Sequence, residues 1–230
     1  MYNTLIAGLP AMELALSEQT AKTLCAFGEA VVRQNEVMNL TAITAPDQVA
    51  KLHLLDSLSV LKSADLRGKR LIDVGCGAGF PGVPVKIACP EVELTLLDSL
   101  GKRMAWLEQI LPQLGVDAEC VTARAEEFAA KRRESYDFAT SRAVARLNIL
   151  LELTAPFVKV GGAVLAMKGA AAREELAEAK NAIGKLGLKL ETVLDFPVDG
   201  TSHSVIVLRK VKPTPTPYPR RYAKIKQSPL

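Results

Sequence analysis

Residues Leu71 to Pro84 read LIDVGCGAGFPGVP, and this stretch decides the fold. The apolar residues before the first glycine are typical of a buried strand. Gly75, Gly77 and Gly79 then allow the backbone to turn sharply and to approach a ligand without side-chain obstruction. The stretch therefore predicts a strand followed by a turn that binds a nucleotide-like cofactor.

A carboxylate follows at the end of the next apolar run, where Asp98 comes directly after residues 92–97. An ionised aspartate offers acceptors for the two hydroxyls of a ribose. The glycines are spaced Gly-x-Gly-x-Gly, which departs from the Gly-x-Gly-x-x-Gly pattern of dinucleotide sites. Asp73 adds a negative charge that suits a sulfonium better than a phosphate. We therefore expect S-adenosylmethionine as the cofactor, held by Asp73, Gly75, Gly77, Gly79 and Asp98.

From Arg70 onward, strand-like and helix-like segments alternate. We expect strands near 70–74, 93–97, 117–122, 137–141, 162–167, 189–195 and 203–211. We expect helices near 102–114, 147–158 and 171–186. Such alternation predicts a Rossmann-like α/β fold with a mostly parallel sheet and helices on both faces. The short turn region 197–201 allows the final strand to run antiparallel.

The chain divides into three parts by its patterning. Apolar residues recur at helical spacing over 17–34 and 46–60, which predicts an N-terminal helical segment, 1–65. Residues 66–212 form the expected cofactor-binding core. Residues 213–230 contain prolines at alternate positions from Pro213 to Pro219, which predict an extended arm.

The net charge of +4 is unevenly distributed. No acidic residue follows Asp199, whereas seven basic residues do, which leaves 22 basic against 25 acidic in the rest of the chain. A basic C-terminal arm favours a polyanionic partner such as nucleic acid, although a solvated tail is the ordinary explanation of a charge run.

Composition argues against several other classes of protein. The four cysteines are scattered without a Cys-x-x-Cys pair and only two histidines are present, so we expect neither a metal site nor a disulfide framework. No apolar stretch is long enough to cross a bilayer, and the N-terminus lacks the pattern of a signal peptide. We expect a cytoplasmic monomer with no membrane partner.

Segments along most of the chain resemble the bacterial 16S ribosomal RNA guanine-N7 methyltransferase G family, also called the glucose-inhibited division protein B family. The extension Gly-Phe-Pro-Gly-Val-Pro at 79–84 is more specific than the glycine loop alone. The other matching segments are Asn39-Leu-Thr-Ala-Ile43, His53-Leu-Leu-Asp-Ser-Leu58, Leu97-Asp-Ser99, Lys102-Arg103, Arg124-Ala-Glu126, Ser141-Arg-Ala143 and Tyr218-Pro-Arg220.

The resemblance implies methylation by S-adenosylmethionine at N7 of a single guanine, G527 in the usual 16S rRNA numbering, in the 530 loop. It also implies a class I methyltransferase sheet of seven strands, the seventh antiparallel. Gly75, Phe80, Ala125, Glu126 and Arg142 look like the family's cofactor contacts. The implied partner is 16S ribosomal RNA or the small-subunit particle.

Residues for the RNA side are hypotheses drawn from charge and position. Arginine and lysine side chains near the strand ends are suited to phosphates, and the target guanine must be unpaired or flipped out. The candidates are Asn39, His53, Lys102, Arg146, Lys168, Arg220 and Arg221. Asn39, Asp56 and Ser141 are candidate acceptors around the guanine.

No catalytic base is expected, because guanine N7 has an in-plane lone pair and loses no proton before attack. Alignment of N7, methyl carbon and sulfur is then the main catalytic contribution. The catalytic residues stay unassigned. The alternatives are a methyltransferase acting on another RNA or a small molecule, a noncatalytic ribosome-assembly factor, and an NAD-dependent oxidoreductase with a similar sheet.

Overall fold

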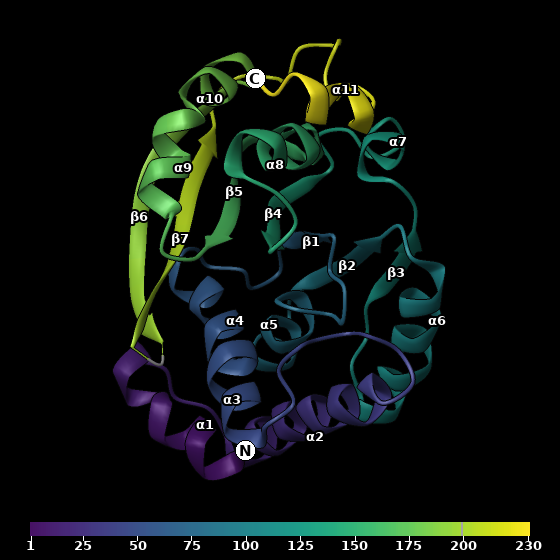
Figure 1. The fold of residues 1–230 in the computed structure, drawn as a ribbon, viewed down its shortest axis with the longest axis vertical. Coiled ribbons are helices and arrows are strands. Elements are labelled where there is room, and N and C mark those ends of the chain that lie inside the picture. Colours follow the sequence, from purple (N-terminus) through teal and green to yellow (C-terminus); the bar gives the residue numbers. More distant parts are fainter. Residues whose placement is uncertain (199) are drawn as a thin grey trace.

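A seven-stranded sheet in the order β3-β2-β1-β4-β5-β7-β6 forms the centre of the computed structural model, which describes residues 1–198 and 200–230 (Figure 1). All pairings from β3 to β5 are parallel, and β7 is antiparallel to both of its neighbours. The strands are β1 (Arg70–Val74), β2 (Glu93–Asp98), β3 (Glu119–Thr122), β4 (Tyr136–Arg142), β5 (Val158–Lys168), β6 (Leu188–Val198) and β7 (Thr201–Lys210). The predicted α/β architecture with an antiparallel last strand is confirmed.

Helices precede, connect and follow these strands. The α-helices are α1 (Tyr2–Gly8), α2 (Glu18–Asn35), α3 (Pro46–Val49), α4 (Asp56–Leu58), α5 (Gly82–Ala88), α6 (Gly101–Ile110), α7 (Ala125–Ala129), α8 (Leu147–Thr154), α9 (Ala172–Glu178), α10 (Lys180–Lys185) and α11 (Tyr222–Gln227). A π-helical stretch, Ala50–Leu55, joins α3 to α4. Short 3-10 turns lie at Pro10–Met12, Ser59–Lys62, Pro112–Leu114 and Ala155–Phe157.

The pleat of the strands separates the interior into two layers. In β5, Leu165 packs with the N-terminal helices, whereas its neighbours Val164 and Ala166 pack with α8 and α10. In β7 the same alternation places Val205 on the first face and Ile206 on the second. Alternate residues of a strand point to opposite faces, so both faces of the sheet are buried.

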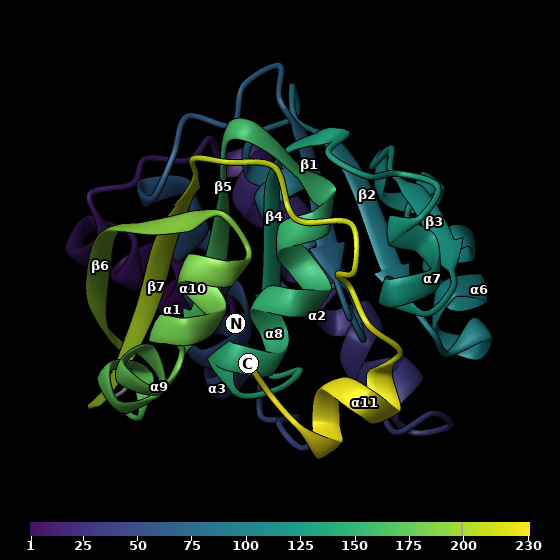
Figure 2. The same cartoon turned by 90° about the horizontal axis from the view of Figure 1, so that it is seen from above.

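Each face is covered by a different part of the chain. Residues of α1, α2, α5 and α6 share one apolar cluster with the sheet. Residues of α7, α8 and α10 share the other. Figure 2 shows α8 and α10 in front of the strands and the purple N-terminal helices behind them. The first 62 residues therefore help to bury the sheet.

Helix α2 begins at an N-capping residue within the segment predicted to be helical. Ser17 lies just before the helix, and its hydroxyl accepts a hydrogen bond from the Thr20 backbone N–H at 3.1 Å. This contact satisfies one of the free donors at the helix start. Residues 39–43, between α2 and α3, are not helical.

The strands end close to their predicted positions, but several helices do not. The expected helix 171–186 is divided into α9 and α10, and the expected helix 46–60 contains the π-helical stretch. The turn region 197–201 does connect β6 to β7, although Asp199 itself lies outside the described residues. Helix α11, at the top of Figure 1, has no counterpart in the sequence prediction.

The C-terminal arm is docked rather than extended into solvent. Arg133 donates to the carbonyl oxygens of Tyr218, Thr214 and Pro215. Ile225 of α11 is fully buried. These contacts fix the arm on the face covered by α7 and α8, because three of its backbone carbonyls accept hydrogen bonds from the partly buried Arg133.

Candidate functional site

A cavity of about 870 Å³ lies at the carboxyl ends of β1, β4 and β5. Binding sites in open α/β sheets form at this edge, beside the switch in strand order between β1 and β4. The wall is built from the glycine loop after β1, residues 142–146 after β4, residues 167–169 at the end of β5, the segment 40–56, Arg103, Glu175, Thr201 and His203.

The glycine loop combines positive backbone angles with close approaches. Gly75, Gly77 and Gly79 have φ values of 72°, 57° and 95°. A Cβ on Gly75 would lie 2.5 Å from Cγ2 of Val144, whereas one on Gly77 would meet nothing nearer than Arg103 Nη1 at 3.8 Å. Gly77 therefore opens directly onto the cavity, and Gly75 is closed against the loop that follows β4.

Gly79 has a different role from the first two glycines. A Cβ there would lie 2.8 Å from Val83 and 3.2 Å from the ring of Phe27, and Gly79 does not line the cavity. It therefore permits the close packing of α5 and α2 beneath the loop. A direct contact between Gly79 and a cofactor stays a prediction.

Asp98 is joined to the glycine loop, as the pairing in the sequence suggests. Its Oδ2 accepts a hydrogen bond from Gly77 N at 3.0 Å, and its Oδ1 accepts one from Leu100 N at 2.9 Å. Each carboxylate oxygen keeps a further lone pair. The carboxylate is thus fixed beside the loop, with acceptor capacity left for ligand hydroxyls.

Asp73 lies beneath the loop and not at the cavity wall. Its carboxyl group is fully buried, Oδ2 accepts from Gly82 N at 2.8 Å, and Oδ1 has no partner among the described residues. Burial raises the pKa of Asp73 to about 7. Asp73 therefore holds the start of α5, and its contact with the cofactor stays a prediction.

Arg142 is the centre of the cavity wall. Its Nη1 donates to the Leu52 carbonyl oxygen at 2.9 Å and to Oδ2 of Asp56 at 2.8 Å. Its Nη2 lies 3.1 Å from Nδ1 of His53, and its guanidinium carbon lies 5.0 Å from the ring centroid of Phe80. Within residues 1–198 and 200–230 no acceptor is assigned to Nε. Arg142 thus keeps Nε–H and one Nη2–H for a ligand.

Both ring nitrogens of His53 contact protein groups. Nδ1 lies 3.1 Å from Nη2 of Arg142 and 3.1 Å from the Leu52 carbonyl oxygen. Nε2 lies 2.7 Å from Oγ1 of Thr41. The imidazole also stacks on Phe80, with 4.7 Å between ring centroids. His53 is therefore a packing and hydrogen-bonding residue of the cavity wall.

Burial and the neighbouring charge of Arg142 lower the pKa of His53 to about 4. The unfolded chain protonates this histidine near pH 6.5, whereas the folded chain does so only near pH 4. The unfolding free energy should therefore fall by about 3 kcal/mol as the pH drops through this window. Urea unfolding across the window should show less of this loss in His53→Gln. An equal loss in both proteins would contradict this role of His53.

Asp56 bridges two cationic groups. Its Oδ2 accepts from Arg142, and its Oδ1 lies 2.7 Å from Nδ1 of His203. Burial alone would raise the pKa of Asp56, but the His203 hydrogen bond and the Arg142 charge lower it overall. The hydrogen bond to Asp56 raises the pKa of His203. Asp56, a candidate acceptor for the guanine, is thus occupied by protein donors on both oxygens.

Two predicted RNA-binding cations line the cavity but are paired. Lys168 donates to the Ala145 carbonyl oxygen and lies 2.8 Å from Glu175 Oε2. Arg146 forms ion pairs with Glu174 and Glu178. Any contact of Lys168 or Arg146 with RNA therefore involves a charge that a glutamate already partly neutralises.

Other candidates lie beside the cavity or away from it. Lys102 is exposed and does not line the wall; its neighbour Arg103 does, and donates to the Asn39 carbonyl oxygen at 3.3 Å. Asn39 is exposed next to the lining residues Leu40 and Thr41. Ser141 is buried, and its hydroxyl donates to the Val74 carbonyl oxygen, so its side chain is not at the wall.

Ala125 and Glu126 begin α7, directly after β3 and its following turn. Neither residue lines the cavity. Oε1 of Glu126 accepts a hydrogen bond from the backbone N–H of Tyr222 at 3.2 Å, which ties α7 to α11. Contact with a cofactor stays a prediction for both residues.

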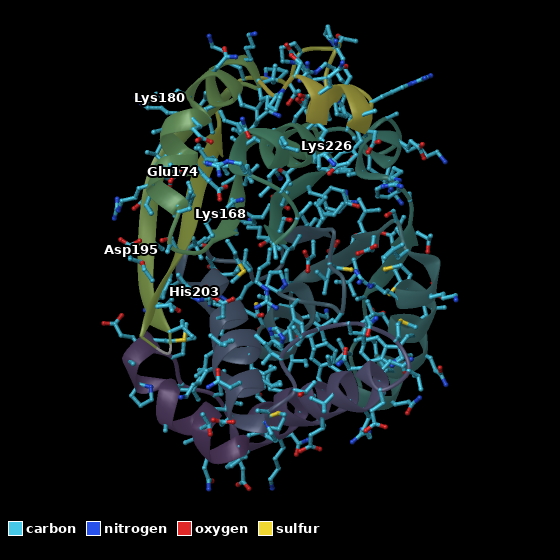
Figure 3. The ribbon with its side chains drawn as sticks, viewed as in Figure 1. Lys168, Glu174, Lys180, Asp195, His203 and Lys226 are labelled. Atoms are coloured by element: carbon cyan, nitrogen blue, oxygen red, sulfur yellow. The ribbon has the colours of Figure 1, made fainter. Side chains whose placement is uncertain are left out.

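The two arginines of the C-terminal arm, Arg220 and Arg221, do not lie at the cavity wall, and their contact with RNA stays a prediction. Arg220 donates through Nε and Nη2 to the buried carboxylate of Glu152, at 2.8 and 2.6 Å. Arg221 precedes α11, and neither arginine lines the cavity. Figure 3 places Lys226 of α11 at the upper end of the molecule, well away from His203 and Lys168. Charge alone could not reveal this, because the buried Glu152 is distant in sequence.

Sequence reasoning also missed several polar wall residues, among them Thr41, Arg103 and His203. Thr41 and Arg103 lie within segments that carry the family resemblance, so a signal for them was present. His203 had no such signal, since it enters the site only because β7 inserts beside β5.

Two negative findings concern the described residues. Residues 1–198 and 200–230 contain no group of three or more histidine, cysteine, aspartate or glutamate residues arranged to bind a metal. None of their helices combines the length and apolar character required to span a bilayer.

Comparison with known proteins agrees with this geometry. The family described as "rRNA small subunit methyltransferase G" matches residues 20–203. Ribosomal RNA small subunit methyltransferase G of Alkaliphilus metalliredigens is 43% identical over 212 residues, covering 90% of this chain and 89% of the relative. The protein of the same name from Alkaliphilus oremlandii is 41% identical over 229 residues, covering 97% and 96%.

Solved structures share the fold at low sequence identity. M. jannaschii TYW2 in complex with AdoMet has a TM-score of 0.56 and 12% identity, covering 68% of this chain and 75% of that one. TrmN from Thermus thermophilus has a TM-score of 0.55 and 20% identity, covering 68% and 48%. The chain therefore has the Rossmann-like fold of class I S-adenosylmethionine-dependent methyltransferases.

Proposed function

Because this chain belongs to the rRNA small subunit methyltransferase G family, we propose that it methylates N7 of a single guanine, G527, in the 530 loop of 16S ribosomal RNA. It is a methyltransferase of small-subunit ribosomal RNA, and S-adenosylmethionine is its methyl donor. The proposal extends this to the position and the ring nitrogen. It further includes action in the cytoplasm as a monomer.

One observation carries the proposal: the glycine loop and a cationic wall face the same cavity. Gly75 and Gly77 form one side, and Arg146 and Lys168 contribute to the other. A donor bound at the loop and an RNA held by the cationic wall would therefore meet in one cavity. Such an arrangement supports transfer by proximity and orientation.

The residues present fit S-adenosylmethionine. Gly77 leaves the cavity open where a side chain would project into it, and Asp98 has acceptor capacity next to that opening. We assign Asp98 to the ribose hydroxyls and the free Nε–H and Nη2–H of Arg142 to the cofactor carboxylate. When bound, the cofactor supplies a methyl group activated by its sulfonium.

Further cofactor contacts follow from the resemblance. Phe80 lies at the wall between His53 and Phe27, where its ring offers an apolar surface. The turn at Ala125 and the remaining oxygen of Glu126 are proposed for the adenine edge. The chain is proposed to divide into the helical segment 1–65, the core 66–212 and the arm 213–230.

The chemistry of the wall suits a nucleophile that needs no deprotonation. Both ring nitrogens of His53 contact protein groups, and both oxygens of Asp56 accept from protein donors. Guanine N7 attacks through its own lone pair, so an engaged histidine and aspartate do not prevent reaction. The protein then orients the guanine and excludes water.

The decisive experiment compares 16S ribosomal RNA from matched cells with and without this protein. Mass spectrometry of nuclease fragments should show loss of one 7-methylguanine, at G527, in cells that lack it. Purified protein and S-adenosylmethionine should restore that mark on the unmodified RNA or small-subunit particle. Persistence of the modification in deleted cells, or its restoration at another base, would refute the proposal.

A further inference from the structure

His203 has one ring nitrogen committed and one free. Its Nδ1 lies 2.7 Å from Oδ1 of Asp56, and its side chain is 25% exposed at the cavity wall. No partner is assigned to Nε2 within the described part of the chain. Since Asp56 fixes the ring through Nδ1, Nε2 is the nitrogen left for a ligand. In Figure 3, His203 lies beside α4, below the labelled Lys168.

Asp56, Arg142 and a protonated His203 together carry an excess of one positive charge. Asp56, from α4, is shared between His203 and Arg142, so one carboxylate faces two cations when His203 is protonated. Further ion pairs lie on neighbouring elements. Lys168 of β5 pairs with Glu175 of α9, Asp195 of β6 pairs with Arg173, and Arg146 pairs with Glu174 and Glu178 of α9. Burial lowers the pKa of His53, on the π-helical stretch, to about 4, so this histidine is neutral near pH 7.

This arrangement is suited to an anion. Asp56 is 4% exposed, so its contacts to His203 and Arg142 are little screened by water. A protonated imidazole that is fixed on one side and open on the other donates a directed, charge-assisted hydrogen bond. The anion that an RNA brings to a cavity wall is its phosphate.

We propose that His203 binds one phosphate of the RNA through Nε2–H, and that Asp56 is the positioning residue that orients His203 for this contact. The inference rests on the proposed function, because it takes RNA as the substrate. It adds a contact residue that neither charge patterning nor the family resemblance indicated. Arg142 serves the cofactor and His203 serves the RNA, so Asp56 organises both sides of the cavity.

The test uses His203→Asn, because the asparagine amide can occupy the place of Nδ1 and still donate to Asp56 while nothing replaces Nε2. The affinity for unmethylated 16S ribosomal RNA is measured over a range of KCl concentrations. We expect roughly tenfold weaker binding at low salt and a salt slope reduced by about 0.7–0.9, as for one lost phosphate contact. Calorimetric affinity for S-adenosylmethionine should be unchanged.

Two controls make the outcome specific. Lys180→Gln removes an exposed cation on α10 outside the cavity and should leave the salt slope as in the wild type. An RNA with adenine in place of the target guanine should show the same loss on His203→Asn. If the loss disappears with adenine, His203 contacts the base and the phosphate assignment is overturned.

A pH series tests the positioning role of Asp56. The hydrogen bond to Asp56 raises the pKa of His203, and burial lowers that of His53 to about 4, so NMR can follow the two histidines separately. RNA affinity should fall as the pH rises through the His203 titration, and this step should be absent in His203→Asn. In Asp56→Asn, the His203 titration should move to lower pH.

Three results would overturn the proposal. These are an unchanged salt slope in His203→Asn, an unchanged pH step in that variant, and a loss of S-adenosylmethionine affinity as large as the loss of RNA affinity. The last would show that His203 acts through Arg142 instead. Failure of the proposed function is distinguishable, because the wild-type protein would then leave the guanine unmethylated at every pH and salt concentration.

Discussion

Replacing Arg220 with alanine should lower the free energy of unfolding by about 3 kcal/mol. Glu152 is fully buried and accepts three hydrogen bonds from Arg220, through the backbone N–H, Nε and Nη2. The variant retains only the backbone donor, so a buried carboxylate loses its counter-charge. We expect the lower end of the range for a broken buried pair because the Arg220 side chain is 21% exposed.

Denaturant unfolding measures this effect, and Lys226→Ala is its matched control. Lys226 is an exposed cation of the same arm with no assigned partner among the described residues, so its loss should change stability by less than about 0.5 kcal/mol. The double variant Arg220→Leu/Glu152→Leu should regain much of the lost stability, because it leaves no unpaired charge. A loss below about 1 kcal/mol for Arg220→Ala would show that the arm is not anchored by this pair.

Because the arm is anchored to the folded protein, truncating it does not test its RNA affinity separately from its effect on stability. Removal of residues 213–230 would take away Arg220 and also Thr214, which accepts from the buried Lys210 and binds Glu134 through its backbone N–H. A truncated protein would therefore lose stability together with any RNA affinity. Exposed positions such as Lys224 and Lys226 separate the two effects, because their side chains have no assigned partner in the described chain.

Replacing Gly75 with alanine should weaken the binding of S-adenosylmethionine by roughly 100-fold, equivalent to about 2.7 kcal/mol. The backbone φ of Gly75 is 72°, which costs an alanine about 1 kcal/mol. The added Cβ would also lie 2.5 Å from Cγ2 of Val144. Val144 itself lines the cavity, as Gly75 does. Either residue must move to relieve the clash, and either movement distorts the cavity wall.

Gly68→Ala is the control that separates the cost of the positive φ from the steric clash with Val144. Gly68 has a φ of 64°, but a Cβ there would meet nothing within 4 Å. It shares the backbone cost and should bind the cofactor like the wild type in calorimetry. Shortening the opposing side chain, in Gly75→Ala/Val144→Ala, should restore part of the affinity. Wild-type affinity in Gly75→Ala alone would mean that the loop does not need this close approach.

Some parts of this site could be predicted from the sequence because they depend on residues that are close together in the chain. The strand-loop sequence ending at Gly79 has few conformations available, and the carboxylate of Asp98 follows the next strand. Parallel strands place both at the same edge, where Gly77 N and Asp98 Oδ2 form a hydrogen bond. The alternation of strands and helices likewise predicted the mostly parallel sheet, and the short turn region 197–201 allowed its last strand to run antiparallel.

Other parts depended on partners that no local pattern reveals. Asp73 and Asp98 look alike in sequence, since each is an aspartate in the last two residues of a strand, yet Asp73 is buried beneath the loop and Asp98 lies beside it. Arg220 and Lys168 both appear as basic side chains available to RNA. Each is paired with a glutamate, and for Arg220 that glutamate is fully buried.

The sequence alone determined the order of the elements, the glycine loop and the edge of the sheet at which a ligand binds. These follow from backbone freedom and hydrophobic periodicity, which are properties of residues close together in the chain. The tertiary structure alone decided which charges are free. Asp56 joins Arg142 and His203, and Glu152 takes Arg220 out of the basic arm, because ion pairs form between residues that only folding brings together.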